Sequence, residues 1–265
     1  MRIATWNINS IRLRLNNVIR FAIENNIDII CLQETKTINE NFPLKDFYEI
    51  GFKYYHIRGE KSYNGVAILS KLPITFKGYI NWCKSNDTRH IYVQINESIT
   101  LHNFYIPAGG DLPDTRKNKK FKHKIDFLKE MIKFFKKDKT RTKILLGDLN
   151  IAPNENDVWS HKQLTNVISH TPIEIKFINN LLEECMWNDV IRYAELKNKK
   201  LFSWWSYRSK DWKKSNRGRR LDHIFVSNNL LKLVKKRKIF KELRGDNKPS
   251  DHVPVMIEIE NCESL

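Results

Sequence analysis

Short apolar segments that end in reactive polar side chains recur along the 265-residue chain. Segments of this kind are typical of buried strands, and ligand sites of open α/β sheets form beyond the carboxyl ends of such strands. The pattern therefore predicts a sheet-based fold with one functional site at the strand ends. The polar residues that end or follow these segments are Asn7, Gln33, Glu34, Tyr105, Asp148 and Asn150, while Asp251 and His252 precede the last segment.

Strand-like and helix-like spacings of apolar residues alternate along the chain, which predicts a mixed α/β architecture. The predicted strands are Arg2–Ile8, Asp28–Leu32, Lys53–Ile57, Gly65–Ser70, His90–Ile95, Ile99–Ile106, Lys143–Gly147, Leu221–Val226 and Val253–Ile259. The predicted helices are Leu15–Ile23, with Leu15, Val18, Ile19, Ala22 and Ile23 on one face, Phe121–Phe135 and Pro172–Cys185.

The second predicted helix has Asp114 or Thr115 as its candidate N-cap. Its polar face carries Lys117, Lys120 and Lys124. We expect residues 207–220 to form an exposed basic loop, because they have no apolar periodicity. No internal repeat and no Pro/Gly/Ser-rich linker interrupts the chain, so we expect a single domain over residues 1–265.

The net charge of +17 is unevenly distributed. Three basic blocks, residues 116–143, 208–220 and 232–248, carry more than the whole excess, so the remainder is slightly acidic. A compositional drift toward lysine would spread the excess evenly, whereas a surface that binds a polyanion concentrates it. The distribution therefore favours nucleic acid as a partner over a merely solvated surface.

The polar residues at the strand ends suit phosphodiester hydrolysis. The candidate ligands are the carboxylates Glu34, Asp148, Asp222 and Asp251 and the carboxamides Asn7 and Asn150. Hard oxygen ligands suit Mg²⁺ or Mn²⁺ rather than zinc, and His252 can be oriented by a carboxylate and become cationic. A divalent cation, a carboxylate base and a cationic donor are what this reaction requires. The alternative reading of any one of these residues is an ordinary turn.

Other sequence features exclude several protein classes. Cys31, Cys83, Cys185 and Cys262 are scattered, without zinc-ligand spacing or the pattern of a disulfide framework. No apolar run approaches the roughly 18 residues of a membrane span, and residues 1–10 lack the layout of a signal peptide. We therefore expect a cytoplasmic protein. The chain contains no GxxxxGK[ST] loop for nucleotide triphosphates.

Eight motifs together make the sequence specific. They are WNIN (Trp6–Asn9), LQET (Leu32–Thr35), NGVAILS (Asn64–Ser70), YIPAGG (Tyr105–Gly110), GDLNIAP (Gly147–Pro153), FSWWSYRS (Phe202–Ser209), RLDHIFVS (Arg220–Ser227) and SDHVPV (Ser250–Val255). As a set, and in this order, they resemble exonuclease III in the class II apurinic/apyrimidinic endonuclease branch of the endonuclease/exonuclease/phosphatase superfamily.

The resemblance implies a four-layer sandwich, in which two mixed β-sheets pack face to face with helices outside. It implies a Mg²⁺-dependent DNA repair enzyme that cleaves duplex DNA 5′ to abasic sites, processes blocked 3′ ends and acts as a 3′→5′ exonuclease. We expect it to be a monomer. The alternatives are a nonspecific nuclease or small-molecule phosphatase of the same superfamily, or a catalytically inactive nucleic-acid-binding relative.

The resemblance also implies roles for individual residues. Glu34 resembles the principal metal ligand, and the wider candidate metal set is Asn7, Asp148, Asn150, Asp251 and His252. Asp148 activates the water or protonates the leaving oxygen. Asn7 and Asn150 contact substrate, with Asn150 orienting the phosphate. His252 contacts the phosphate and is held by Asp222. Tyr105 contacts the phosphate or supports the site, although aromatic residues in strands often serve packing alone.

Further candidate substrate contacts are Trp204, Arg208, Arg219 and Leu221. The resemblance puts Trp204 and Leu221 in the pocket for the baseless sugar, whereas Trp205 could equally be a core residue. The chain departs from the family pattern at Arg219, which stands where an apolar or aromatic residue is usual and which could turn toward a phosphate instead. It departs again at Ala108, where many relatives have Asn or Gln, so one substrate contact is missing there.

Overall fold

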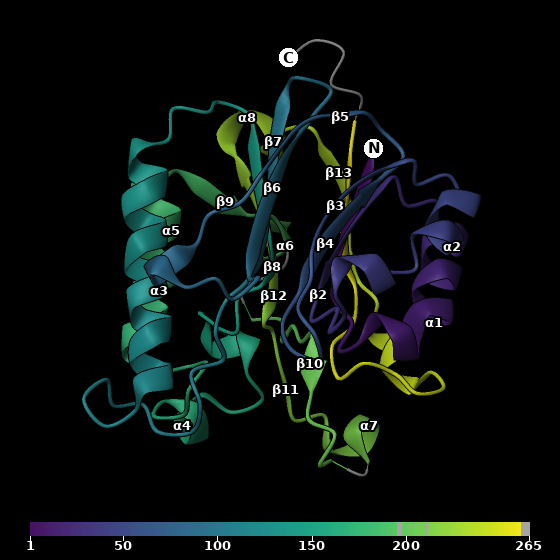
Figure 1. Ribbon diagram of the computed structural model, residues 1–265. Coiled ribbons are helices and arrows are strands. Elements are labelled where there is room, and N and C mark those ends of the chain that lie inside the picture. Colours follow the sequence, from purple (N-terminus) through teal and green to yellow (C-terminus); the bar gives the residue numbers. More distant parts are fainter. Residues whose placement is uncertain (195–197, 210, 261–265) are drawn as a thin grey trace.

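Two mixed β-sheets pack face to face in the computed structural model, which describes residues 1–194, 198–209 and 211–260 (Figure 1). Within this part of the chain each large sheet has six strands. The first sheet has the order β13 (Val234–Ile239), β14 (Val255–Ile259), β1 (Arg2–Asn7), β2 (Ile29–Gln33), β4 (Val66–Ser70) and β3 (Tyr54–Arg58). The second has the order β5 (Ile74–Gly78), β6 (His90–Ile95), β7 (Ile99–Tyr105), β8 (Lys143–Asp148), β12 (Asp222–Ser227) and β9 (Trp187–Asp189).

One parallel strand pair in each sheet positions the functional residues. Strands β1 and β2 are parallel and are joined by helix α1 (Ile11–Glu24), and β7 and β8 are parallel and are joined by helix α3 (Lys119–Lys137). Parallel strands end at the same edge of a sheet. The pairing of Asn7 with Gln33, and of Tyr105 with Asp148, therefore puts these strand ends at one end of the molecule.

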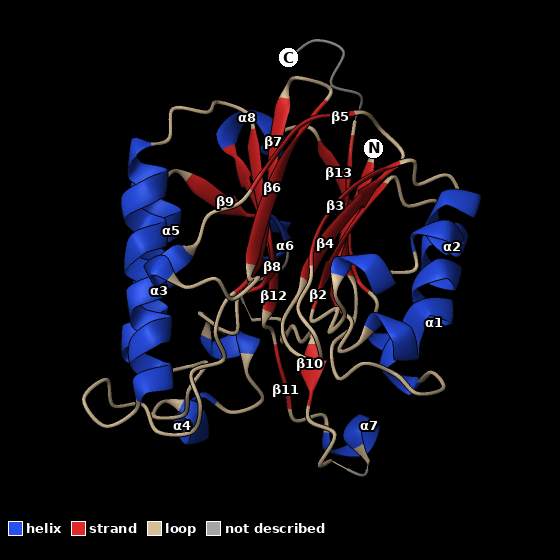
Figure 2. Cartoon of the chain, in the orientation of Figure 1, coloured by secondary structure: helices blue, strands red, loops and turns tan. Residues whose placement is uncertain are grey.

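Three apolar layers hold the sheets and helices together. The inner faces of both sheets share a buried core that includes Ile3, Ile68, Val93 and Leu146. Helices α1 and α2 (Leu44–Glu49) cover the outside of the first sheet, and α3 and α5 (Pro172–Glu184) cover the outside of the second (Figure 2). The helix–sheet–sheet–helix order confirms the predicted four-layer α/β sandwich.

The remaining elements are short. They are the helices α4 (His161–Leu164), α6 (Val190–Ala194), α7 (Trp212–Ser215) and α8 (Asn228–Leu231), the 3₁₀ turns Asn39–Asn41, Trp82–Lys84, Glu155–Asp157 and Lys241–Gly245, and the paired strands β10 (Trp204–Trp205) and β11 (Gly218–Arg219). The predicted strands all appear, with ends that move by at most two residues.

The beginning of α3 differs from the prediction. The N-cap is Asn118, whose side chain accepts hydrogen bonds from Lys120 N and Phe121 N, and neither Asp114 nor Thr115 has this role. Asp114 instead accepts from Arg116 N, because a carboxylate readily closes a local turn. Lys124 was predicted on the polar face but has no exposed surface.

Two further predictions from the pattern are wrong. Residues 207–220 are not a plain loop, since they contain α7 and β11, and Arg220 at their end is completely buried. On α1, Val18 and Ala22 are buried as expected, but Ile23 is 53% exposed because the helix turns that position away from the sheet. Pro172–Cys185 does form a helix, α5, with Cys185 as its C-cap.

The cysteines and the helices bear on two expectations from the sequence. Cys31, Cys83 and Cys185 are free thiols, and Cys262 lies outside the described residues. Among the helices of the described part, none combines the length and apolar character needed to cross a membrane.

Candidate active site

Asn7 joins the two sheets at the centre of the site. It is the last residue of β1 and is completely buried. Its Nδ2 donates to Glu34 Oε1 at 2.9 Å and to Asp148 Oδ2 at 2.9 Å, and these carboxylates follow or end β2 and β8. One carboxamide therefore connects acidic groups that are 114 residues apart in the sequence but come from facing sheets.

Glu34 is held by three donors. Besides Asn7, the hydroxyl of Tyr105 donates to Glu34 Oε1 at 2.8 Å, and Lys36 Nζ lies 2.8 Å from Glu34 Oε2. Burial opposes ionisation, but Asn7 and Lys36 outweigh it and hold the pKa of Glu34 below its usual value. Burial, followed by the charges of Glu34 and Asp148, raises the pKa of Tyr105. Tyr105 is therefore a neutral hydrogen-bond donor at physiological pH.

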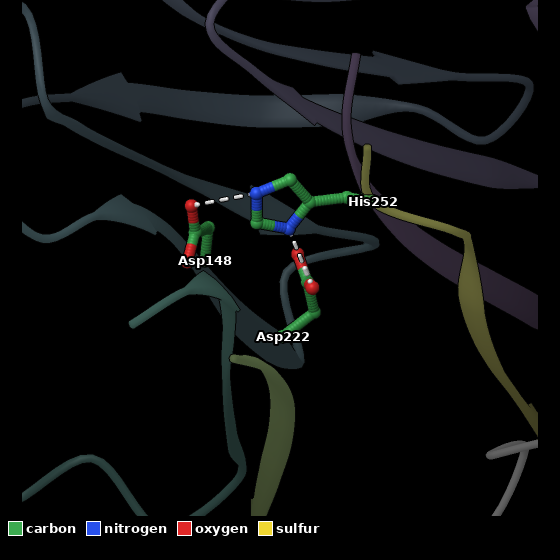
Figure 3. Close-up of side chains that lie close together, drawn as sticks. All are labelled: Asp148, Asp222 and His252. Atoms are coloured by element: carbon green, nitrogen blue, oxygen red, sulfur yellow. Dashed lines mark hydrogen bonds and ion pairs between the residues drawn. The ribbon is translucent and has the colours of Figure 1, made fainter. Parts of the chain in front are cut away.

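Asp148, His252 and Asp222 form a line of alternating charge (Figure 3). His252 Nδ1 lies 2.8 Å from Asp222 Oδ2, and His252 Nε2 lies 3.7 Å from Asp148 Oδ2. The two aspartates meet because they are paired residues of the antiparallel strands β8 and β12. Ser203 Oγ donates to Asp222 Oδ2 at 2.6 Å and fixes this carboxylate from behind.

The three groups shift one another's protonation. Burial lowers the pKa of His252, but the charges of Asp222 and Asp148 outweigh it and raise the pKa well above that of free histidine. Burial also raises the pKa of Asp148, and the attraction of His252 opposes this shift. The site therefore keeps a proton on the imidazole at neutral pH, next to a carboxylate that can accept one.

Asn150 and Asp251 complete the predicted cluster. Asn150 has a left-handed backbone (φ 54°), its N donates to Asp148 Oδ1 at 2.9 Å, and its Nδ2 donates to Asp148 Oδ2 at 3.2 Å. Asp251 accepts from Trp204 Nε1 at 3.0 Å and from Asn9 Nδ2 at 3.3 Å. Asn9 Oδ1 in turn accepts from Lys36 Nζ at 2.6 Å, which connects Asp251 to the Glu34 side of the site.

The chemistry of these donors fits a hard divalent cation. Glu34 and Asp251 contribute carboxylate oxygens, and the carboxamides of Asn7 and Asn9 donate to Glu34 and to Asp251, respectively. The ammonium of Lys36 already lies against Glu34 Oε2, so this corner of the site attracts positive charge. Atoms of Asp148, Asp222 and His252 also lie within 4.8 Å of one another. However, both imidazole nitrogens face carboxylates, which favours a protonated donor over a metal ligand.

Trp204 and Leu221 form an apolar wall beside the cluster. They pack with Ala152, Val158 and Leu164, and Trp204 is also held by its hydrogen bond to Asp251. Arg219 stacks over the Trp204 ring at 5.4 Å from its centroid. Its Nη1 donates to Ile168 O at 3.0 Å and to Ser169 Oγ at 2.8 Å, so the guanidinium turns toward the 168–169 turn.

The other candidate contacts lie around this wall. Arg208 is exposed on the segment after β10, outside the hydrogen-bonded cluster. Trp205 is 1% exposed and packs edge-on against Trp212, as expected of a core residue. Arg220 is buried in ion pairs with Asp157 at 2.8 Å and Asp189 at 2.7 Å, which fixes the backbone just before Leu221.

Several site residues escaped the sequence interpretation. Asn9 and Lys36 each lie two residues beyond a predicted site residue, Asn7 and Glu34, and this spacing could have drawn attention to them. Their side chains turn inward because Asn9, Glu34 and Lys36 all have positive φ angles, which no spacing rule reveals. Ser203 carried no sequence signal beyond its place in FSWWSYRS.

Comparison with known proteins agrees with this geometry. The family model described as the Endonuclease/Exonuclease/phosphatase family matches residues 4–252. Exodeoxyribonuclease III of Haemophilus influenzae is 29% identical over 97% of this chain and 99% of its own length. An AP endonuclease structure from Archaeoglobus fulgidus is 30% identical, covers 98% of this chain and 100% of its own, and has a TM-score of 0.91.

A further solved structure is a 3′ phosphatase from Neisseria bound to a product DNA hairpin. It is 29% identical, covers 98% of this chain and 100% of its own, and has a TM-score of 0.90. The family model spans nearly the whole chain, and both solved structures share its fold from end to end. The chain therefore belongs to the endonuclease/exonuclease/phosphatase family, as its motifs predicted.

Proposed function

We propose that this protein is a divalent-metal-dependent DNA repair hydrolase, which nicks duplex DNA 5′ to abasic sites and processes blocked 3′ ends. The observation that carries the proposal is the bridge from Asn7 to Glu34 and Asp148, with His252 against Asp148. This arrangement brings together a carboxylate for a cation (Glu34), a group for proton transfer (Asp148) and a cationic donor (His252). Relatives named exodeoxyribonuclease III, AP endonuclease and 3′ phosphatase support DNA as the substrate.

The side chains divide the reaction between them. Asp148 takes a proton from the attacking water, or passes one to the leaving oxygen, because burial raises its pKa toward neutrality. His252 donates from Nε2 to a phosphate oxygen, since Asp222 holds Nδ1 and keeps the ring cationic. Tyr105 and Asn7 orient Glu34 by direct hydrogen bonds.

We assign Mg²⁺ as the cofactor, with Mn²⁺ as an acceptable substitute. Glu34 and Asp251 would hold it, because both offer carboxylate oxygens and neither is committed to an imidazole. When bound, the cation would neutralise charge on the phosphate and on the leaving oxygen. The same two residues also accept hydrogen bonds from Asn7 and Asn9, which keeps their orientation fixed.

The surface around the site suits duplex DNA with a missing base. Trp204 and Leu221 offer an apolar wall for a baseless sugar. Lys117, Lys119 and Lys120 are exposed at the start of α3, and Lys213 and Lys214 are exposed on α7. The start of α3 and the whole of α7 lie toward the same end of the molecule as the site (Figure 1). We infer that the protein binds DNA as a monomer and that it acts in the cytoplasm.

A duplex that carries one tetrahydrofuran abasic analogue tests the proposal. With Mg²⁺ we expect a single nick 5′ to the analogue, and with EDTA we expect none. Cleavage of intact duplex at random positions would instead identify a nonspecific nuclease, and binding without cleavage would identify an inactive relative. A second substrate with a 3′-phosphate end tests 3′ processing, which should release inorganic phosphate under the same conditions.

A further inference from the structure

Lys124 is a lysine with no exposed surface, although it belongs to a helix that faces solvent. It extends inward from α3, and its ammonium makes three contacts. Lys124 Nζ lies 2.5 Å from Glu174 Oε1, 2.8 Å from the backbone oxygen of Asn150 and 3.3 Å from that of Ala108. All three protons of the ammonium therefore have acceptors inside the protein.

The two backbone oxygens belong to the loops that leave β7 and β8 at the site. Asn150 lies two residues beyond Asp148, and Ala108 lies three residues beyond Tyr105. The backbone of Asn150 is left-handed, a conformation that asparagine adopts more readily than most residues, and contacts to both its carbonyl and its amide fix this turn. Lys124 holds the carbonyl of Asn150, while the backbone N and the carboxamide of Asn150 contact Asp148.

Gly109 and Glu174 form the surroundings of the Lys124 side chain. Gly109 has φ +95°, which strains any residue with a side chain, and a Cβ there would also lie 3.1 Å from Lys124 Cδ and 3.1 Å from Ile168 Cγ2. Glu174 is also completely buried, and it accepts from Ser169 N at 2.9 Å and from Thr171 Oγ1 at 2.6 Å. The ion pair thus connects α3, α5 and the loop after β8.

We propose that Lys124 is a positioning residue, which fixes the backbone of Asn150 and thereby the groups that contact Asp148. This inference rests on the proposed function. A requirement for stability alone does not account for the pair, because replacing a buried ion pair by well-packed apolar residues is often neutral or stabilising. Lys124 itself has no exposed surface, and its ammonium contacts two loops of the site, which gives it a role in holding the site's geometry.

The variant Lys124→Met/Glu174→Gln removes both charges and leaves neither partner buried alone. We expect kcat for abasic cleavage to fall about 10- to 100-fold while KM changes little, since small misplacements of catalytic groups have effects of this size. Hydrogen exchange should also become faster in the peptide 148–152, whatever the substrate. An unchanged kcat together with unchanged exchange would overturn the proposal.

A matched control is the buried ion pair at the start of β8, the strand that ends at Asp148. Lys143 is 5% exposed, its Nζ lies 3.0 Å from Asp138 Oδ2, and it begins β8, whereas Asp148 ends it. Lys143→Met/Asp138→Asn should leave kcat unchanged, whatever its effect on stability. An equal loss of kcat in both double variants would show that any buried ion pair has this effect, and would overturn a specific role for Lys124.

Lys124→Arg covers the case in which the double variant does not fold. Arginine keeps the buried charge opposite Glu174, but its planar head cannot reproduce the two carbonyl contacts. We expect a melting temperature near that of the wild type and a reduced kcat, and a wild-type kcat would contradict the proposal. If the wild-type protein itself fails to nick abasic duplex, the proposed function is wrong, and hydrogen exchange alone then decides the role of Lys124.

Discussion

At the scale of single residues, the site depends on one proton placed between acidic groups. His252 lies between Asp222 and Asp148, and each of its ring nitrogens faces a carboxylate. The imidazole can act as a cationic donor only while Asp222 supplies the balancing charge, and Ser203 keeps that carboxylate in place. Asp148 is therefore the one aspartate of the pair that is available for proton transfer with substrate.

Asp148→Asn tests this assignment. An amide of the same shape cannot exchange the proton, so we expect kcat to fall by at least about 100-fold. DNA binding should persist, because Asn7 and Asn150 stay in place. Single-turnover cleavage and a gel-shift assay measure the two quantities. Asp126→Asn, an aspartate ion-paired with lysines on the surface of α3, is the control and should leave both unchanged. Near-wild-type cleavage by Asp148→Asn would refute the role.

Glu34→Gln tests the metal assignment. Glutamine keeps the size of the side chain but loses the charge that a hard cation requires, so the Mg²⁺ concentration for half-maximal activity should rise by about 10-fold or more. High Mg²⁺ should restore part of the activity. A titration of the cleavage rate against Mg²⁺ measures the shift, and an unchanged midpoint would mean that Glu34 is not a ligand.

At the scale of elements, the sequence predicted the central strands well, because their apolar runs are continuous. It missed β13, in which four of six residues are basic, since that strand pairs at a sheet edge where lysines are tolerated. It missed β9, β10 and β11 because they are two or three residues long. The inward turn of Lys124 escaped it because an ion pair with Glu174, 50 residues away, overrides the polar character of lysine.

The site was predicted in the same uneven way. The structure brings together Asn7, Glu34, Asp148 and His252, which the sequence singled out because each ends, follows or precedes an apolar run that forms a strand. Their mutual contacts depend on how the two sheets pack, which no local pattern contains. Lys36 has a positive φ angle and contacts Glu34 and Asn9, and neither feature can be read from a local pattern.

Two buried histidines, one on β6 and one on β7, should make the stability of the protein depend on pH. His90 and His102 are buried side by side, with His90 Nε2 3.2 Å from His102 Nδ1. Burial lowers the pKa of His90 well below 6.5 and lowers the pKa of His102 to about 3. Both rings therefore stay neutral in the folded protein, while the unfolded chain binds protons below pH 6.5. The free energy of unfolding should therefore be highest above pH 6.5 and should decrease as the pH falls below that value.

For His102 alone, this loss amounts to roughly 2 kcal/mol at pH 5. Urea unfolding at several pH values between 5 and 7.5 measures it. The variant His90→Phe/His102→Phe should show a shallower dependence on pH than the wild type, even if its absolute stability is lower. Equal slopes in the two proteins would mean that this pair does not control the acid sensitivity.

At the scale of the whole molecule, the basic blocks do not act as one surface. Helix α3 has 19 residues and is about 28 Å long, so the two ends of block 116–143 lie far apart. Its beginning lies toward the site end of the molecule, and its other end leads into the start of β8 at the opposite end (Figure 1). Block 232–248 contains β13, where Lys235, Lys236 and Lys238 pair with glutamates.

Two charge reversals on α3 test which cations face DNA. Lys117→Glu/Lys119→Glu/Lys120→Glu changes the end near the site, and Lys133→Glu/Lys137→Glu/Lys139→Glu makes the same change in charge at the far end. Each lost phosphate contact lowers the dependence of log K on log salt by about 0.9. We therefore expect the first variant to bind abasic duplex more weakly, with a slope reduced by up to about 3. The second should keep the wild-type slope, because its lysines lie beyond the reach of DNA bound at the site, and equal losses in both variants would mean that net charge alone, rather than a located surface, attracts the duplex.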